Sequence, residues 1–226
     1  MLAMMGGRGV QSQTVEDYLK TIYSLGERDD GPVTTSRISQ RLDLSASSVS
    51  GMLRKLARQG LIDHRPYGGI ALTDVGLAGA LRVVRRHRLV EMFLVAQLGY
   101  GWDEVHEEAE VLEHAISDQL VERIDAALGH PEFDPHGDPI PGLGGELPSF
   151  KAHRLPTLTP GRTGRLVRVD DRDPEVLRHL TQAGIALGQT IELLGQLPFD
   201  GPYLVRTQDG ADHHFAPMLA NALWVE

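Results

Sequence analysis

The chain of 226 residues contains no cysteine, and aromatic residues make up only 5% of it. Without thiols it cannot form disulfides, thiolate nucleophiles or zinc–thiolate sites, so any metal site must use oxygen and imidazole nitrogen. No run of about 18 apolar residues is present to span a membrane. The amino terminus also lacks a basic segment followed by an apolar core. We therefore expect a cytoplasmic protein without a membrane partner.

Charge is distributed unevenly along a chain whose overall balance is −9. Residues 31–73 contain six basic side chains against two acidic ones, whereas residues 103–125 contain nine acidic side chains against one arginine. Such segregation suits a basic module that faces phosphates and an acidic module that holds cations. The 41% of hydrophobic residues is enough for a folded core.

The acidic stretch predicts one helix over residues 103–128. On a helix, His106, Glu110, Glu113 and His114 share one narrow stripe, because their offsets are 4, 7 and 8 residues. A second, apolar stripe lies beside the first and predicts the packing face: Val105, Ala109, Leu112, Ile116, Leu120 and Ile124. Two imidazoles and two carboxylates at the edge of a packed helix favour a divalent cation site.

Further ligands are available on neighbouring segments. The preceding apolar helix, predicted over residues 77–98, has His87 and Glu91 four residues apart on one face. Asp134 and His136 follow the acidic stretch and could reach back as ligands. The alternative is a solvated acidic surface, which is the usual state of such side chains. Asp17, for example, is by itself typical of a first-turn acid favoured by the helix dipole.

A winged helix is predicted near the amino terminus. After a helix beginning at Ser12 comes a short helix capped by Thr34 or Thr35, and then a second helix capped by Ser45. Residues 61–65 and 70–73 read as two strands joined by a turn. The second helix opens with small polar residues that allow close approach to DNA, and arginines and a lysine follow it. The candidate DNA contacts are Arg37, Ser45, Ser47, Ser48, Ser50, Gly51, Arg54, Lys55, Arg65 and Tyr67.

The rest of the chain reads as a linker and a small barrel. Residues 129–162 contain seven prolines and little helical periodicity. After them, strands are predicted over residues 166–169, 190–194, 203–207 and 222–225, with a helix over residues 174–180 capped by Asp173. We expect a disordered end (1–11), a winged helix (12–74), a helical domain with the candidate metal ligands (75–141), a linker (142–163) and a small β-barrel (164–226).

The ordered series of motifs resembles the diphtheria toxin repressor and manganese transport regulator family of metal-dependent repressors. The motifs are VEDYLKTIY, LSASSVSGMLRKLARQGLI, HRLVE, HEEAEVLEH and HGDPIPG. The resemblance covers nearly the whole chain from Thr14 onward. It implies a mainly α fold with a small β part: a winged helix-turn-helix, a helical metal-binding and dimerisation domain, and an SH3-like barrel. It also implies a homodimer that binds a near-palindromic double-stranded DNA operator, with no enzymatic activity and no protein substrate.

The same resemblance implies two groups of metal ligands. The primary site maps to Asp17, His87, Glu110, Glu113 and His114. A second site maps to Glu91, Asp134, His136 and, from the barrel, Asp173, while His106 matches a ligand of the iron-type ancillary site. Iron-type members have a methionine at the position of Asp17 and a cysteine at that of Glu110. Hard oxygen ligands at both positions favour Mn²⁺, with Fe²⁺ or Co²⁺ as substitutes.

Three functions remain open at this point. The first is a manganese-dependent repressor of metal-uptake genes, or an iron-responsive version of it. The second is a winged-helix regulator that responds to a non-metal ligand and has a merely solvated acidic helix. The third is a metal-dependent hydrolase, although the sequence shows no separate acid–base pair for catalysis.

Overall fold

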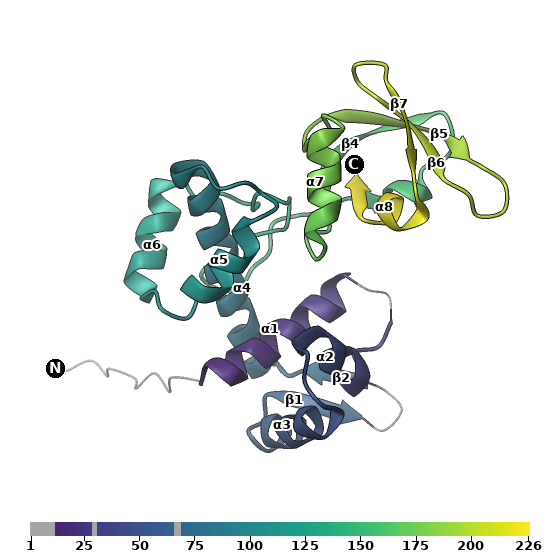
Figure 1. Cartoon of the computed structure of the whole chain (residues 1–226). Helices are drawn as coiled ribbons and strands as arrows, with labels where there is room; N and C mark the ends of the chain where they lie inside the picture. Colours follow the sequence, from purple (N-terminus) through teal and green to yellow (C-terminus); the bar gives the residue numbers. More distant parts are fainter. Residues whose placement is uncertain (1–11, 29–30, 66–68) are drawn as a thin grey trace. The chain divides into compact units, whose positions relative to one another are not determined.

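A computed structural model describes residues 12–28, 31–65 and 69–226, without the side chains of His64 and Arg65. The chain divides into two compact units, residues 1–85 with 143–145 and residues 86–142 with 146–226. The long helix α4 (Asp74–Leu98) begins in the first unit and ends in the second (Figure 1). Among the described residues, no helix is long and apolar enough to cross a membrane.

The first unit is a winged helix, as the sequence predicts. It contains α1 (Gln13–Arg28), α2 (Thr35–Leu42), α3 (Ala46–Arg58), and the antiparallel strands β1 (Ile62–Arg65) and β2 (Gly69–Leu72). Its core joins the apolar faces of the three helices and the two strands, with Leu19, Ile38 and Leu56 fully buried. Helices and wing therefore share one hydrophobic core.

Local capping sets the tight turn between α2 and α3. The Thr34 hydroxyl accepts from Arg37 N at 3.3 Å, and the Ser45 hydroxyl accepts from Ser48 N at 3.2 Å. Between them Asp43 adopts a left-handed conformation with φ 51° and ends α2. Aspartate tolerates this region better than most side chains. The two caps and the left-handed Asp43 therefore define the turn of the helix-turn-helix.

The helical part of the second unit corrects one prediction. The expected single helix over residues 103–128 is two helices, α5 (Val105–Leu112) and α6 (Asp118–Ala127). Ser117 caps α6 by accepting from Leu120 N at 3.2 Å, which starts a new helix instead of continuing the old one. Glu113 still has helical backbone angles, whereas His114 lies in the turn.

The break also changes which residues pack. Val105 and Ala109 are buried against the end of α4, as predicted. After the break the buried apolar residues on α6 are Val121 and Ile124, whereas Leu120, predicted to pack, is 44% exposed. The predicted packing stripe is therefore wrong at Leu120, whose place in the core is taken by Val121, and right at Ile124.

The second half of this unit is a small β domain. Its elements are β3 (His153–Arg154), η1 (Leu155–Thr157), β4 (Arg162–Val169), α7 (Pro174–Gln182), β5 (Thr190–Gln196), β6 (Tyr203–Thr207), β7 (Asp212–Phe215), α8 (Pro217–Asn221) and β8 (Leu223–Val225). The six strands pair antiparallel in the order β3-β8-β4-β5-β6-β7, and α7 and α8 flank the sheet (Figure 1). The four predicted strands and the predicted helix are present. Strands β3 and β7 and helix α8 were not predicted.

The proline-rich segment after α6 includes a short ordered loop. An isolated bridge joins Phe133 to Pro139, and Asp134 N donates to Asp138 O at 3.0 Å. The loop lies against β4, because Val169 N donates to His136 O at 2.9 Å. Both predicted ligands of this loop, Asp134 and His136, are consequently buried.

Candidate metal centre

The end of α4 supplies two buried side chains that face α5. His87 and Glu91 are one helical turn apart, and His87 Nε2 lies 2.9 Å from Glu91 Oε1. The other ring nitrogen, His87 Nδ1, lies 2.6 Å from Oε2 of the fully buried Glu113. One imidazole is thus held between two carboxylates from different helices.

His106 on α5 completes a cluster with these residues. Its Nδ1 lies 3.2 Å from Glu91 Oε1 and its Nε2 lies 3.4 Å from Glu110 Oε1. The rings of His87 and His106 meet edge to face, with centroids 4.9 Å apart. Ligand atoms of His87, His106 and Glu110 all lie within 4.8 Å of one another, a spacing that suits one metal ion.

Glu113 and His114 lie together at the end of α5. His114 Nε2 is 3.3 Å from Glu113 Oε1, so Glu113 contacts one imidazole with each carboxylate oxygen. Arg86 donates to the backbone carbonyl of Glu113 at 3.0 Å and fixes this turn to α4. Asp17, the remaining member of the predicted primary site, belongs to α1 of the first unit.

A second cluster forms where the loop after α6 meets α4 and the β domain. Asp134 Oδ1 accepts from the backbone N–H groups of His136 and Asp138, at 2.8 and 2.9 Å. His136 Nε2 donates to the carbonyl of Trp102 at 2.6 Å, which leaves Nδ1 facing the carboxylates. Ligand atoms of Glu91, Asp134 and His136 lie within 4.8 Å of one another, and all three residues are buried.

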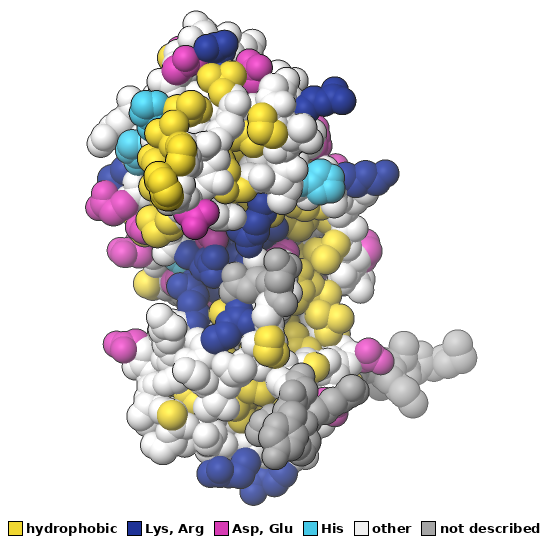
Figure 2. Space-filling model, turned by 90° about the vertical axis from the view of Figure 1, so that its right-hand side faces the viewer, with side chains coloured by type: hydrophobic (Ala, Val, Ile, Leu, Met, Phe, Trp, Pro, Cys, Tyr) yellow, Lys and Arg dark blue, Asp and Glu magenta, His cyan; other side chains and the backbone are white. Residues whose placement is uncertain are grey.

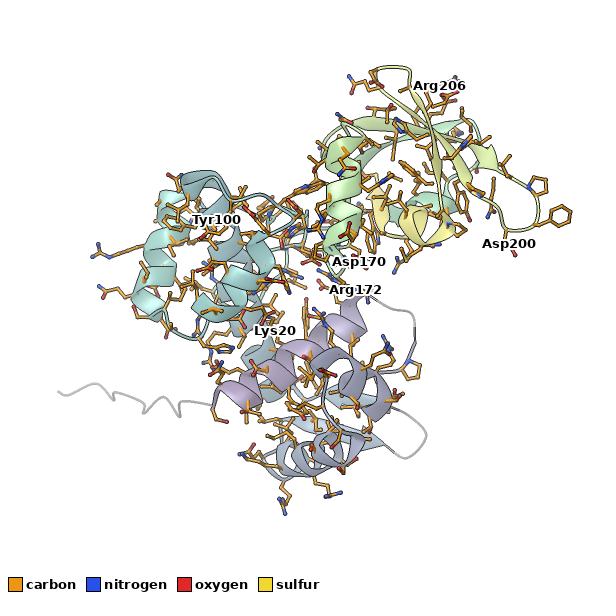
Figure 3. The ribbon with its side chains drawn as sticks, viewed as in Figure 1. Lys20, Tyr100, Asp170, Arg172, Asp200 and Arg206 are labelled. Carbon is orange, nitrogen blue, oxygen red and sulfur yellow. The ribbon has the colours of Figure 1, made fainter. Side chains whose placement is uncertain are left out.

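The β domain contributes Asp171 to this region, and not the predicted Asp173. Asp171 Oδ2 lies 3.8 Å from His136 Nδ1 and 3.7 Å from His106 Nδ1. Asp173 instead caps α7, its carboxylate accepting from Glu175 N at 3.0 Å. Asp170 pairs with Arg172, whose Nε lies 2.8 Å from Oδ1 (Figure 3). Three nearby aspartates therefore have three different partners, of which the sequence predicts only the capping role of Asp173.

Ionisation in the second cluster is strongly perturbed. Burial opposes the charge of Glu91, but the imidazoles of His87 and His106 outweigh it and hold the pKa of Glu91 well below its usual value. Burial and the nearby carboxylate of Asp138 raise the pKa of Asp134 to about 7. Burial also disfavours charge on His136, yet the surrounding carboxylates, first Asp134, raise its pKa to about 8. The cluster thus holds protons at neutral pH that a cation would displace.

These donors fit a divalent metal ion. His136 Nδ1 and Glu91 Oε2 are buried, 3.9 Å apart, and neither has a hydrogen-bond partner among the described residues. Buried polar atoms normally have partners, so this pair indicates a missing ligand. Hard oxygen and imidazole donors without sulfur are a set that Mn²⁺ and Fe²⁺ accept.

Seven of the ten predicted DNA-binding residues belong to α3 or are its N-cap residue. Ser45, Ser47, Ser48, Arg54 and Lys55 are exposed, and Ser50 and Gly51 are half-buried. Figure 2 shows Lys and Arg side chains gathered at the bottom of the view, the end at which Figure 1 draws α3.

The other three predicted DNA contacts differ. The Arg37 guanidinium donates to the carbonyls of Gly31, Pro32 and Leu25, at 2.9, 2.8 and 3.2 Å, so it closes the α1–α2 loop. Tyr67 lies outside the described residues, and Arg65 is described only by its place in β1.

Comparison with known proteins agrees with this architecture. Three family models match: "Iron dependent repressor, N-terminal DNA binding domain" over residues 11–70, "Iron dependent repressor, metal binding and dimerisation domain" over 73–142, and "FeoA domain" over 153–226. Together they span most of the chain. Relatives that are 30–32% identical over 94% of this chain are named diphtheria toxin repressor. The chain belongs to the diphtheria toxin repressor family. Members of this family are DNA-binding transcriptional repressors, not enzymes.

Individual relatives differ in the metal that their names give. The diphtheria toxin repressor of Corynebacterium glutamicum is 32% identical over 94% of this chain and 96% of its own length. The "Iron-dependent repressor IdeR" of Mycobacterium tuberculosis is 42% identical, but the match spans only 58% of this chain and 56% of that protein. A solved "Manganese-dependent transcriptional repressor complex with manganese" is 46% identical over 94% of this chain and 99% of its own, with a TM-score of 0.88.

Proposed function

We propose that this protein is a manganese-dependent transcriptional repressor that controls metal-uptake genes in the cytoplasm. The observation that carries the proposal is the buried pair His136 Nδ1 and Glu91 Oε2, two potential ligand atoms that have no hydrogen-bond partner among the described residues and lie 3.9 Å apart. Manganese is favoured over softer metals because every candidate donor is a carboxylate or an imidazole. The solved manganese-dependent repressor to which the chain is similar supports the same choice.

Two metal sites are proposed. The first takes Asp17, His87, Glu110, Glu113 and His114, an assignment that rests on the family motifs. The second takes Glu91, Asp134 and His136, with Asp171 in place of Asp173. His106 lies within reach of both groups and is an additional ligand candidate for either one.

Electrostatic repulsion is the proposed reason why DNA binding depends on bound metal. Without a counter-ion the carboxylates of both clusters repel one another and disfavour a tight arrangement. A bound divalent cation supplies two positive charges that cancel this repulsion. Linkage requires that the DNA-binding conformation hold the metal more tightly, and a tenfold gain in DNA affinity needs about 1.4 kcal/mol of coupling.

DNA binding is assigned to α3 and the wing. Small side chains at the start of α3 allow close approach to base edges, and Arg54, Lys55 and Arg58 reach phosphates. The matched dimerisation domain supports a homodimer, which would place two such helices on the two half-sites of a near-palindromic operator.

Fluorescence anisotropy of a labelled manganese-uptake promoter fragment tests the proposal at fixed salt. Titrations contain Mn²⁺, anaerobic Fe²⁺ or a chelator. The decisive variant is Glu110→Ala, and the matched control is Glu107→Ala, an exposed glutamate on the same helix outside the cluster. We expect tight binding with Mn²⁺ only, lost in Glu110→Ala and kept in Glu107→Ala. Equal binding in chelator contradicts the proposal and favours the regulator of a non-metal ligand, whereas preference for Fe²⁺ points to an iron-responsive repressor.

A further inference from the structure

A buried ion pair joins the metal-candidate loop to the β domain without using any candidate ligand. Arg168 on β4 contacts Asp138 Oδ1 through its Nη2 atom, and both side chains are almost fully buried. The guanidinium lies over two aromatic rings, 5.6 Å from the centroid of Phe150 and 4.8 Å from that of Trp224. The arginine is therefore held in a fixed orientation as well as paired.

A second arginine approaches the same carboxylate from the helical side. Arg88 Nη2 lies 3.7 Å from Asp138 Oδ1, and its Nη1 donates to the carbonyl of Pro139 at 2.6 Å. Asp138 thus lies between a helix residue and a strand residue. Buried ion pairs give little net stability compared with apolar packing, but they are demanding in geometry. A positional role explains this one better than a stabilising role.

The backbone around the pair fixes the register of loop and strand. His136 O accepts from Val169 N at 2.9 Å. A Cβ atom on Gly137, whose φ is +84°, would lie 1.9 Å from the carbonyl oxygen of Val167. Neighbouring residues of the loop therefore meet neighbouring residues of β4, and the ion pair is formed in the middle of this contact.

Asp171 follows Arg168 by three residues, at the exit of the same strand. Its Oδ2 lies 3.8 Å from His136 Nδ1, on the loop that Asp138 anchors. We propose that the Asp138–Arg168 ion pair is a positioning device that holds the Asp171 carboxylate at the Glu91–Asp134–His136 cluster. The inference rests on the proposed metal-binding function, and it assigns Arg168 and Asp138 roles as positioning residues, not ligands.

The test measures Mn²⁺ binding to the full-length protein, by the electron paramagnetic resonance signal of free Mn²⁺. The variant is Arg168→Gln, and the matched control is Arg165→Gln, on the same strand and paired with Glu226 at the surface. Loss of a residue that orients a ligand costs about 10- to 100-fold in metal affinity. In Arg168→Gln we expect the Mn²⁺ affinity of the Glu91–Asp134–His136 site to fall by this factor. In Arg165→Gln we expect Mn²⁺ binding to be unchanged.

A double-mutant cycle with Asp171→Ala separates positioning from general destabilisation. If Arg168 acts through Asp171, Arg168→Gln causes no further loss of affinity in the Asp171→Ala background. A loss of equal size in both backgrounds overturns the proposal, as does normal Mn²⁺ binding by Arg168→Gln. Should Arg168→Gln fail to fold, Arg168→Lys serves the same cycle, because it keeps the charge but not the planar contacts.

The two levels of proposal fail in different ways. If the wild-type protein binds no Mn²⁺, the proposed function itself is wrong. If the wild type binds Mn²⁺ and Asp171→Ala weakens that binding, while Arg168→Gln leaves it intact, only the positioning role is wrong.

Discussion

Trp102 and His136 are joined twice in the second unit. The backbone carbonyl of Trp102 accepts from His136 Nε2 at 2.6 Å, and the two rings stack with centroids 6.3 Å apart. The indole Nε1 also donates to Thr181 Oγ1 on α7 at 2.8 Å. The backbone of Trp102 thus orients one candidate ligand, and its indole stacks on that ligand and contacts the β domain.

This contact makes Trp102 a reporter of metal binding. The chain has two tryptophans, and Trp224→Phe leaves Trp102 as the single emitter. We expect saturable quenching of its fluorescence on addition of Mn²⁺, a paramagnetic ion, because the indole is stacked on a proposed ligand. The control is His136→Ala in the same background, which should abolish the saturable phase. Quenching that persists unchanged in this variant would assign the signal to another site.

Metal affinity should increase with pH through the neutral range. The pKa of His136 is raised to about 8 and that of Asp134 to about 7, so both hold protons at pH values where their ordinary counterparts do not. Metal binding must release these protons, and apparent affinity therefore rises as pH rises and falls as pH falls below about 8. Calorimetric titration in buffers of different ionisation enthalpy measures the protons released. Zero proton release at neutral pH would contradict the assignment.

Periodicity and capping predicted the winged helix because its determinants are local. Val15, Leu19 and Ile22 form the buried face of α1, and Ser45 caps α3 as expected. The break between α5 and α6 was not predicted, because the apolar repeat continues through Ile116 and only the competing cap at Ser117 interrupts it. A cap residue inside a periodic stretch is a signal that can be weighed in advance.

The clusters were only partly predictable, because they depend on contacts between distant segments. His87 and Glu91 are local partners on one helix, and their proximity follows from spacing. Asp171 was missed because its side chain meets His136 only after the loop has packed against β4. The positive charge of Arg37 predicts a DNA contact, but its guanidinium donates to three nearby backbone carbonyls.

Replacement of Gly137 by alanine should destabilise the second unit. The residue has φ +84°, and a Cβ atom would lie 1.9 Å from Val167 O, a backbone atom that cannot rotate away. The control is Gly184→Ala, which has φ +70° and no atom within 4 Å of the new Cβ. Backbone strain alone costs about 1 kcal/mol in the control. We expect a loss of about 3 kcal/mol or more for Gly137→Ala, because the clash adds to the strain.

Denaturant unfolding measured without metal compares these two glycine variants. Equal losses would show that the loop moves away from β4 at little cost, and that its register is not fixed by the close contact at Gly137.

Lys55 should contribute to DNA binding by charge alone. It is exposed in the last turn of α3, the helix whose start carries the small side chains that face the groove in the proposed docking. A lysine that reaches a phosphate releases about one counter-ion, so Lys55→Ala should lower the slope of log affinity against log salt by about 1. The effect should be similar on operator and unrelated DNA, because phosphate contacts do not read sequence.

The matched control for this measurement is Lys151→Ala, an exposed lysine of the second unit far along the chain from the winged helix. Anisotropy titrations in saturating Mn²⁺ at several salt concentrations give the slope for each protein. If Lys55→Ala keeps the wild-type slope but loses discrimination between operator and unrelated DNA, Lys55 contacts a base edge instead of a phosphate. If both lysine variants lower the slope equally, the effect comes from net charge, and α3 has no special share in phosphate binding.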